Sequence, residues 1–383
     1  MKKIKVLYLT YSLNAGGIEA LCVNIIKRIN KDKFQIDFVT VKAKNQKQFY
    51  DDIVRQCGSK IYAVGDVGKG PIRKYFTTRR DIRYIIKNGE YDVVHVHWGH
   101  FDRIPDEFAA KLYGVKKIII HSHSGGLESS VPFYRTRTIL QKCLKHLYPY
   151  LATDFFTCSD KASEWAFPKS LIKENRVVQI NNGVDVDVFS YSDELREKYR
   201  KKLQLNDEFV VGHVGRFTEV KNHTFILDVF YEIHRIEPNS KLLLIGNGPL
   251  SNDIRNKISS LNLNDNVIMF GNSTEVFGMM AAMDIFLFPS IYEGLPVSGI
   301  EAQAMGLKVF ASENISKDVI ITNNWITKSL HDTAENWAHD IISQGRNYPR
   351  MNMRNDIEKA GFSIEKTVKY LEEVYSCNDS NLE

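Results

Sequence analysis

Short apolar runs alternate with amphipathic stretches along the first half of the chain, and this alternation restricts the fold more than any other feature of the sequence. Residues 18–29, for example, place Leu21, Ile25, Ile26 and Ile29 on one face of a helix. Apolar strands separated by helices predict a parallel sheet that is covered on both faces. The expected strands are residues 4–10, 34–41, 60–64, 93–98, 117–123, 154–159 and 177–181.

The alternation stops at a polar, charged stretch over residues 191–206 and then begins again. A chain of 383 residues is about two to three times as long as a usual domain, so two domains are expected. The fold class is α/β, with two doubly wound, Rossmann-like domains over residues 1–188 and 189–362 that face each other across a cleft. The expected strands of the second domain are residues 209–214, 241–245, 267–270, 285–288 and 308–311, with another at 318–320.

The tail carries apolar positions at helical spacing over residues 355–375, which predicts that it is helical. A C-terminal helix over about 363–383 is expected to pack back on the first domain. In open α/β sheets ligands bind at the carboxyl ends of the strands, so the site is expected at that edge of both sheets.

Composition excludes several classes of protein. No run approaches the roughly 18 consecutive apolar residues that a membrane span needs. Lys5 interrupts the first apolar run, so no secretory signal is expected. The five cysteines are scattered and never in CxxC spacing, which fits neither a disulfide framework nor a metal site and favours a cytoplasmic location.

Charge is distributed unevenly. Residues 1–190 hold 31 Lys and Arg against 19 Asp and Glu, a net charge of +12, whereas residues 191–383 hold 20 against 27, a net charge of −7. This asymmetry suggests that the first half meets an anionic partner. The alternative is two domains with different surfaces and no such partner.

Two loops could bind an anion. Gly16 and Gly17 lie between the first strand and the first helix, where backbone can approach a ligand and the helix offers free N–H groups. Arg216 and Lys221 lie in the corresponding loop of the second domain, where a guanidinium fork and an ammonium could bind a diphosphate. The alternatives are an ordinary strand-to-helix turn and a solvated basic turn.

A third segment follows the expected buried strand 285–288. Glu293 lies just before a helix expected around residues 297–305, and Glu301 lies inside that helix. Gly294 and the first free amides of the helix could bind a sugar hydroxyl or a phosphate oxygen. A carboxylate at each end suits hydrogen bonds to diols.

Histidines raise the question of a metal. His95 and His97 end one strand and His121 and His123 end the next, but no third ligand at metal spacing accompanies the first pair, so no metal site is expected. Asp185 and Asp187 form an Asp-x-Asp pattern that we interpret as structural.

Taken in order, these motifs resemble the retaining nucleotide-sugar glycosyltransferases of family GT4, which have the GT-B architecture. The resemblance spans nearly the whole chain. Its parts are the Gly16-Gly17 loop, the Gly215-Arg216-x5-Asn222 pattern with Lys221, Gly246-Asn247-Gly248-Pro249, Phe270-Gly271, Pro289-Ser290 and the Glu293-x7-Glu301 pair.

The resemblance implies a role for each matching residue. Gly16 and Gly17 would face the diphosphate or the transferred sugar, while Arg216 and Lys221 would bind the diphosphate. Catalytic roles fall to Arg216, Lys221, Glu293 and His123, with Glu293 on the sugar hydroxyls; His123 is preferred to His121 as the histidine near the reacting carbon. The remaining donor-binding positions are Phe270 at the base, Gly294, Leu295, Pro296 and Val297 through their backbone, and Glu301 at the ribose.

The implied reaction transfers a sugar, with retention, from a nucleotide diphosphate sugar to an acceptor hydroxyl. The first domain would bind the acceptor and the second the donor. No cofactor or metal is implied, UDP is the expected nucleotide, and no nucleic acid is expected as a partner. The Glu293 motif reads Glu-Gly-Leu-Pro where Glu-Gly-Phe-Gly is commoner, a form found in exopolysaccharide and capsule branches, so the acceptor is expected to be a saccharide or a lipid-linked saccharide.

Two rival functions stay open: a sugar-nucleotide epimerase of the same architecture, and a silent homologue that assists another transferase. Residues 69–87 carry seven basic residues among aromatic and aliphatic ones, and residues 133–150 repeat the pattern. Either could rest on the anionic inner face of the cell membrane. The alternative is a solvated helix whose apolar side packs on its own sheet.

Overall fold

The protein is described by a computed structural model that covers residues 2–41, 46–65, 70–127 and 132–376. The chain divides into two compact units. Unit 1 comprises Met1–Gly183 and Ile364–Glu383, and unit 2 comprises Val184–Ser363. The expected boundary at residue 188 differs slightly, because Val184 and Val186 pack in the core of unit 2 and the Val184 amide donates a hydrogen bond to the Phe362 carbonyl.

Unit 1 is built on a seven-stranded sheet in the order β3-β2-β1-β4-β5-β6-β7, and every strand pair is parallel. Side chains of β1 alternate between the two faces, as the strand period of two requires: Val6 and Tyr8 enter one apolar core, Leu7 and Leu9 the other. The strands are β1 (Ile4–Thr10), β2 (Phe34–Thr40), β3 (Ile61–Ala63), β4 (Val93–Val96), β5 (Lys117–Ser122), β6 (Asp154–Thr157) and β7 (Val177–Gln179).

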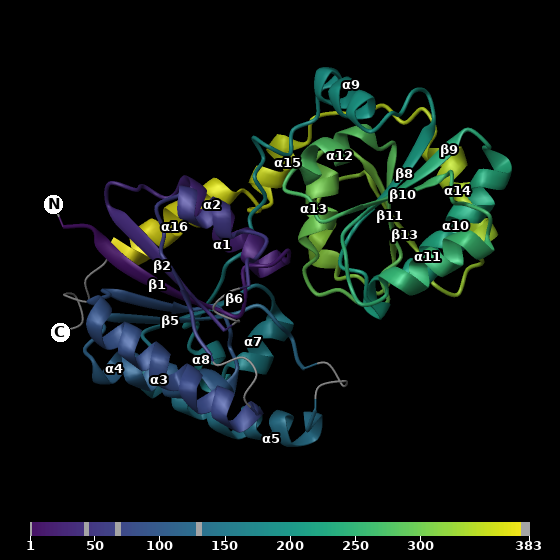
Figure 1. The fold of residues 1–383 in the computed structure, drawn as a ribbon. Coiled ribbons are helices and arrows are strands. Elements are labelled where there is room, and N and C mark those ends of the chain that lie inside the picture. The colour runs from purple at the N-terminus through teal and green to yellow at the C-terminus, as the bar shows by residue number, and fades with distance from the viewer. Residues whose placement is uncertain (1, 42–45, 66–69, 128–131, 377–383) are drawn as a thin grey trace. The chain divides into compact units, whose positions relative to one another are not determined.

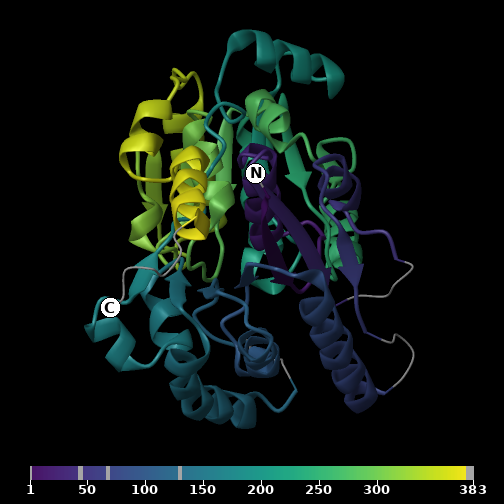
Figure 2. The same ribbon diagram turned by 90° about the vertical axis from the view of Figure 1, so that its left-hand side faces the viewer.

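Helices cover both faces of this sheet (Figures 1 and 2). The core that holds Tyr8 lies beneath α1 (Gly17–Arg28), α2 (Asp51–Gln56) and the last helix, α16 (Ile364–Ser376). The core that holds Leu7 lies beneath α3, α4 and the shorter helices that follow. Those elements are α3 (Pro71–Gly89), η1 (Phe101–Arg103), α4 (Ile104–Leu112), α5 (Tyr134–Leu144), η2 (Lys145–Leu147), α6 (Tyr148–Leu151), α7 (Asp160–Ala166) and α8 (Lys169–Lys173).

Helix α16 belongs to unit 1 although unit 2 precedes it in the chain. Its buried face, with Ile364, Val368 and Leu371, packs in the same core as α1, and the Tyr375 hydroxyl lies 2.8 Å from that of Tyr8. The C-terminal helix therefore packs on the first domain, as the sequence predicts. Residues 377–383, which the prediction includes, lie outside the described residues.

Unit 2 is built on a six-stranded parallel sheet in the order β10-β9-β8-β11-β12-β13. Alternate residues again enter two cores, Val210 on one face and Val211 on the other. The strands are β8 (Phe209–Val214), β9 (Ser240–Ile245), β10 (Val267–Gly271), β11 (Ile285–Phe288), β12 (Lys308–Ser312) and β13 (Trp325–Lys328).

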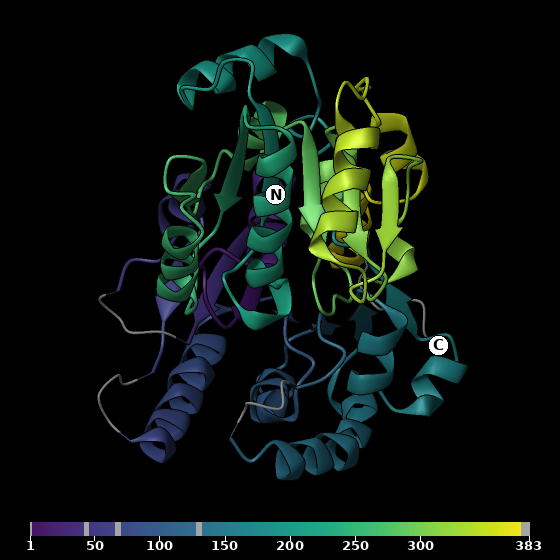
Figure 3. The same cartoon turned by 90° about the vertical axis from the view of Figure 1, so that its right-hand side faces the viewer.

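Helices α10 (His223–Ile236) and α14 (Ala334–Gly345) lie side by side on one face of this sheet with α11 (Ser251–Ser260), as Figure 3 shows. The other face is covered by α9 (Asp193–Lys202), α12 (Val276–Ala282), α13 (Val297–Ala304) and α15 (Arg354–Lys359). Short 3-10 turns occur at η3 (Glu219–Lys221) and η4 (Lys317–Val319).

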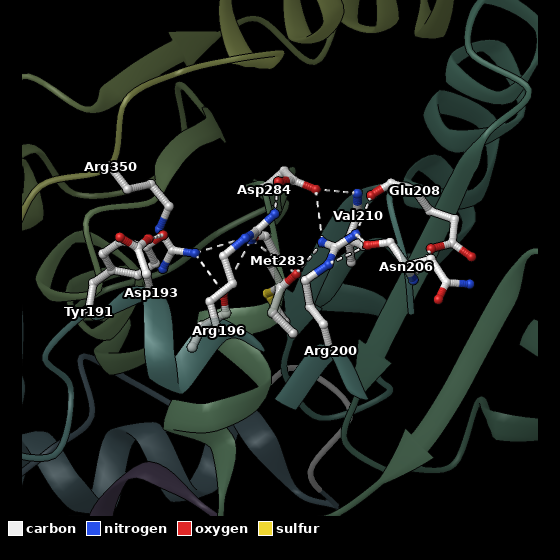
Figure 4. Close-up of polar contacts among 12 residues, drawn as sticks. Tyr191, Asp193, Arg196, Arg200, Asn206, Glu208, Val210, Met283, Asp284 and Arg350 are labelled. Carbon is white, nitrogen blue, oxygen red and sulfur yellow. Dashed lines mark hydrogen bonds and ion pairs between the residues drawn. The ribbon is translucent and has the colours of Figure 1, made fainter. Parts of the chain in front are cut away.

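The charged stretch over residues 191–206 contains α9, and a cluster of arginines attaches it to unit 2 (Figure 4). Arg200 donates to the carbonyls of Asn206, Glu208 and Ala282, and Asp284 accepts from Arg196 at 2.5 Å. Arg350 donates to several carbonyls as well, and burial lowers its pKa to about 9. The stretch that the sequence shows only as an interruption is therefore a docked helix.

One local prediction is wrong. Residues 318–320 form no strand: the Ser316 hydroxyl accepts from the Asp318 amide and starts η4, and the sixth strand is instead β13, seven residues beyond Asp318. The tail is helical, as expected, but in two pieces. It breaks between α15 and α16 at Gly361, whose φ of 82° is left-handed and ends the first helix.

Candidate active site

The sheet of unit 2 has a topological switch point between β8 and β11. From β8 the chain adds β9 and then β10 on one side, and it returns to add β11 on the other side. Loops that leave the carboxyl ends of these two strands diverge, and ligands of open α/β sheets bind at such points. The loops that follow β8 and β11 contain the Arg216–Lys221 and the Glu293–Val297 segments of the sequence.

Lys221 and Glu293 meet across this switch point. Lys221 lies at the end of η3 after β8, Glu293 lies in the loop after β11, and the lysine Nζ forms an ion pair with the Glu293 carboxylate. The same Nζ lies 5.1 Å from the centre of the Phe288 ring. Both charged side chains are mostly shielded from solvent. The structure thus places together a cation and a carboxylate that are far apart in sequence.

Arg216 is held in the same loop by its neighbour. Phe217 is buried and donates its amide to the Asn247 carbonyl at 3.1 Å, while its carbonyl accepts from the Leu250 amide. Gly246 has a φ of 140°, and a Cβ there would come within 2.0 Å of the Gly215 carbonyl oxygen. The loops after β8 and β9 are therefore in contact, and Arg216 itself is exposed beside them.

A polar contact fixes the far end of the β8 loop. Asn222 has a left-handed φ of 56°, and its side-chain amide donates to the Pro289 carbonyl at 3.1 Å. The Ile291 amide donates to the Val220 carbonyl at 2.8 Å. These two bonds attach the β8 loop to the β11 loop and set the separation of the charged side chains that each loop carries.

Helix α13 begins directly beyond Glu293. The Gly299 amide donates to the Pro296 carbonyl at 3.1 Å, whereas the amides of Val297 and Ser298 at the start of the helix have no intrahelical acceptor and are available to an anion or a hydroxyl. Gly294 has open space where a Cβ would lie. Pro296 is buried and Leu295 and Val297 pack at the edge of the core, so these three positions can offer a ligand their backbone rather than their side chains.

Glu301 lies inside α13 and is partly exposed. Burial raises the pKa of its carboxyl to about 7. A carboxyl group that titrates near neutral pH, with no cation recorded beside it among the described residues, is a candidate for hydrogen bonds to ligand hydroxyls. Phe270, at the end of β10, has 41% of its surface exposed, which a buried core aromatic would not have.

Two buried histidines line the same switch point, and the sequence analysis missed them. The His213 Nδ1 lies 2.9 Å from the Leu287 carbonyl, so it bridges β8 to β11. His223 packs against it, and burial lowers the pKa of His223 to about 4, with Lys221 acting in the same direction. His213 lies within the apolar strand β8 and His223 begins α10, and neither belongs to a motif that the sequence analysis identified.

Unit 1 has its own switch point, between β1 and β4. Gly16 and Gly17 lie beyond β1, where Gly16 caps α1 in an extended conformation and a Cβ at Gly17 would meet nothing within 4 Å. Packing of the unit therefore does not require glycine at position 17. Ser12 donates to the Glu19 carboxylate at 2.7 Å, which places an acidic group at this turn that the sequence analysis did not single out.

His121 and His123 differ in exposure. His121 is buried in β5, whereas His123 follows the strand and is partly exposed. His123 Nε2 lies 3.2 Å from His97 Nδ1, and burial lowers the pKa of His123 to about 4. At neutral pH the ring is uncharged, so it could contact a ligand as a neutral donor or acceptor.

Asp185 and Asp187 have structural contacts. Asp185 is buried and accepts from the Val188 amide at 3.1 Å, and Asp187 pairs with Arg354 at 2.5 Å. Of the predicted site residues, the structure brings Lys221 and Glu293 into contact and places Arg216, Phe270, Glu301 and the 294–297 segment at the carboxyl end of the same sheet. Gly16, Gly17 and His123 belong to unit 1.

Two parallel sheets with interleaved helices form two Rossmann-like units, which is the architecture of the GT-B class. The sequence model of Glycosyltransferase Family 4 matches residues 15–188, and that of Glycosyl transferases group 1 matches residues 195–363. The chain belongs to the GT4 glycosyltransferases and is a transferase.

Several relatives match over nearly their whole length. The chain is 29% identical to the glycosyltransferase EpsF of Bacillus subtilis, over 97% of this chain and 96% of EpsF. It is 24% identical to the UDP-Gal:alpha-D-GlcNAc-diphosphoundecaprenol alpha-1,3-galactosyltransferase of Escherichia coli, over 97% of both chains. It is also 24% identical to the capsular polysaccharide biosynthesis glycosyltransferase CapH of Staphylococcus aureus, over 97% of this chain and 98% of CapH.

Solved structures share the fold. HepE of Anabaena, crystallised with UDP, superposes with a TM-score of 0.72 at 18% identity, over 97% of this chain and 99% of HepE. WaaG, a glycosyltransferase involved in lipopolysaccharide biosynthesis, superposes with a TM-score of 0.66 at 13% identity, over 98% of this chain and all of WaaG. At these identities the likeness concerns the fold alone.

Proposed function

We propose that the protein is a retaining glycosyltransferase that moves a sugar from a UDP-sugar to a hydroxyl of a lipid-linked saccharide during assembly of a surface polysaccharide. The observation that carries this proposal is the Lys221–Glu293 pair at the switch point of unit 2, with Arg216 exposed in the same loop. A cation for phosphate and a carboxylate for sugar hydroxyls are thereby in contact before any donor is bound.

Donor binding would exchange one ion pair for another. Diphosphate oxygens would take over the Lys221 ammonium from Glu293, and the Arg216 guanidinium would add a bidentate contact. The Glu293 carboxylate would then accept hydrogen bonds from sugar hydroxyls. Backbone amides of Gly294 to Val297 would support the phosphate, Glu301 the ribose diol and Phe270 the base.

The reaction would break the bond between the anomeric carbon and the diphosphate oxygen and form one from that carbon to the acceptor oxygen on the same face. The acceptor proton would leave with the diphosphate. Catalysis would come from positioning and from Arg216 and Lys221, which stabilise the negative charge that develops on the departing group. No side chain acts as a covalent nucleophile and no metal takes part in this scheme.

The nature of the substrates is supported by the relatives. The printed name of the E. coli relative contains a UDP-sugar donor and a diphosphoundecaprenol-linked acceptor, and CapH acts in capsular polysaccharide biosynthesis. In unit 1 the Ser12–Glu19 pair at the Gly16 turn offers acceptors for hydroxyl groups and disfavours a phosphate, so this turn would bind sugar rather than diphosphate.

Contact with an anionic membrane is part of the proposal. None of the described helices combines the length and the apolar character that would let it cross a bilayer. Helix α3 buries Ile82 and Ile86 against its own sheet, yet it leaves Phe76 66% and Tyr84 69% exposed among its basic residues. Phe133, just before α5, is 82% exposed. Exposed aromatic side chains on a helix rich in basic residues suit the headgroup region. Lys69 lies outside the described residues.

A thermal-shift panel of UDP, GDP, ADP, CMP and NAD tests the donor site. A ligand present at 1,000 times its dissociation constant adds about 4 kcal/mol to the free energy of unfolding. We expect UDP alone to raise the melting temperature, and the Glu301→Ala variant to lose that response while keeping its circular dichroism spectrum. If no nucleotide raises the melting temperature, the result contradicts a donor site and favours a silent homologue that assists another transferase.

Two further assays separate the other parts of the proposal. Incubation of a UDP-sugar without acceptor should leave the sugar unchanged; its epimer as product would favour the epimerase. Flotation with vesicles that contain anionic lipid should recover the wild type at low salt but less of a Phe76→Ser, Tyr84→Ser double variant. An Ile320→Ser variant in unit 2 is the matched control, and equal recovery of all three proteins would remove the membrane contact.

A further inference from the structure

Four histidines project from one face of two adjacent strands in unit 1. His95 is in β4 and His97 directly follows it, whereas His121 is in β5 and His123 directly follows that strand. Residues two apart along a strand share a face, and β4 and β5 are neighbours in register. The strand pairing therefore gathers imidazoles that the sequence shows only as two separate pairs.

Three of these imidazoles are close enough to share one ligand. His95, His97 and His121 each offer a ring nitrogen, and the three nitrogens lie within 4.8 Å of one another. The ring centres of His95 and His97 are 4.1 Å apart, and those of His95 and His121 are 5.4 Å apart. All three residues are buried. The third ligand, which the sequence analysis did not find, is thus His121 on the neighbouring strand.

The ring nitrogens of this cluster lack other partners. His95 Nε2, His97 Nε2 and both nitrogens of His121 are buried without a hydrogen bond. A buried polar atom with no partner is unfavourable, so several in one cluster indicate a missing group. Burial also lowers the pKa of each ring, so all three are neutral at neutral pH and hold a free lone pair.

We propose that His95, His97 and His121 bind a divalent transition metal ion, Zn²⁺ being the ion whose chemistry fits best. Three neutral imidazoles with a water molecule as fourth ligand form a tetrahedral site that zinc favours. The nearest alternative is a metal-free stack of neutral imidazoles whose free nitrogens bind ordered water.

Hydrogen bonds around the cluster have the pattern of an outer coordination shell. His95 Nδ1 lies 2.7 Å from the Tyr375 hydroxyl, and His97 Nδ1 lies 3.2 Å from His123 Nε2. These contacts leave the Nε2 atoms of His95 and His97 for the metal and orient both rings. With Nε2 on the metal, His97 must donate its Nδ1 hydrogen to His123, which fixes the tautomer of His123.

Metal analysis of untagged full-length protein tests this inference. The wild type, depleted with a chelator and then dialysed against Zn²⁺, should retain one ion per chain by atomic emission. Titration of the depleted protein with Co²⁺ should produce the visible absorption bands of tetrahedral cobalt. A His97→Gln variant should lose both, whereas the His146→Gln control, an exposed histidine of the same unit, should keep both.

Tyr375→Phe provides a graded variant that keeps all three ligands. Loss of its hydrogen bond to His95 should weaken Zn²⁺ binding by about 10- to 100-fold at unchanged stoichiometry. The inference is overturned if the depleted wild type shows no tetrahedral cobalt bands, an outcome that does not depend on whether any variant folds. It is also overturned if a folded His97→Gln variant retains as much zinc as the wild type. None of these readouts uses transferase activity.

Discussion

The two units share one architecture but differ in the chemistry of their switch points. Unit 2 places Lys221, Glu293 and Arg216 beyond the strands that flank its switch point. Unit 1 gathers four imidazoles there, with His97 stacked between His95 and His123, whereas unit 2 has two buried imidazoles, His213 and His223, in addition to its charged residues. A doubly wound sheet therefore supplies the position of a site, whereas the residues after each strand decide whether that site attracts charge.

The largest expected effect comes from removing part of the charge that distinguishes the switch point of unit 2 from that of unit 1. Arg216→Ala removes a cation that would stabilise the departing diphosphate, and loss of one such donor typically lowers kcat by about 100- to 1,000-fold. The side chain is exposed, so the fold should stay intact. Initial rates with a UDP-sugar measure the effect. Arg255→Ala, an exposed arginine of the same unit, is the control and should keep the wild-type rate.

Two core substitutions test whether the units unfold separately. Leu371→Ala in α16 creates a cavity in unit 1, and Ile357→Ala in α15 creates one in unit 2, since both side chains are fully buried. Each should lower the free energy of unfolding of its own unit by about 2–5 kcal/mol. Scanning calorimetry with and without UDP should show the UDP-sensitive transition lowered only by Ile357→Ala. Equal lowering of one shared transition would contradict independent units.

The raised pKa of Glu301 predicts how the stability of unit 2 depends on pH. Burial raises its pKa from the ordinary 4.5 to about 7, so the folded state holds a proton that the unfolded state has lost between those values. Stability from this group is therefore fully present at low pH and is lost as the pH rises through 7. Glu301→Gln should remove this part of the pH dependence in chemical denaturation.

The affinity for UDP should change with pH in the opposite direction and should increase as the pH rises. If only the Glu301 carboxylate accepts the ribose diol, a pKa near 7 makes UDP affinity rise about tenfold between pH 6 and pH 8. Calorimetric titration at the two pH values measures this, with Glu301→Gln as the pH-insensitive reference. The same affinity at both pH values in the wild type would remove Glu301 from the ribose contact.

The smallest expected effect concerns the Asp-x-Asp pattern. Asp187 pairs with Arg354 at a partly exposed position, and such pairs contribute about 0.2–1 kcal/mol. Asp187→Ala should therefore change stability by no more than that, and added Mn²⁺ should change neither protein's rate. A Mn²⁺-dependent activity that is lost in Asp187→Ala would show that the pattern binds metal after all.

Much of the fold could be predicted because the strands are buried on both faces and read as continuous apolar runs. β1, β8 and β11 begin and end at the expected residues. β13 was missed because Trp325–Lys328 alternates weakly and lies at a sheet edge, where less burial is required. The segment at residues 318–320 looked like a strand because a serine that starts a 3-10 turn leaves no trace in apolar periodicity.

The residues of the candidate site could be predicted from the sequence in part, whereas their contacts could not. Sequence motifs indicated Lys221 and Glu293 separately, but their contact depends on strand order, which brings β8 beside β11. The metal-type cluster was missed for this reason as well, because His121 reaches His95 and His97 only through the pairing of β5 with β4. Local spacing identifies residue types, whereas sheet order decides which of them meet.

The return of α16 to unit 1 has a consequence for synthesis on the ribosome. Unit 2 is complete once Ser363 has been made, whereas unit 1 must wait for Ile364–Ser376 even though its other residues were made first. Until then the core beneath α16, with Tyr8 and Phe156, lacks its cover. The unit that is translated first is thus the last to finish folding. During that interval its exposed apolar surface is of the kind that chaperones bind.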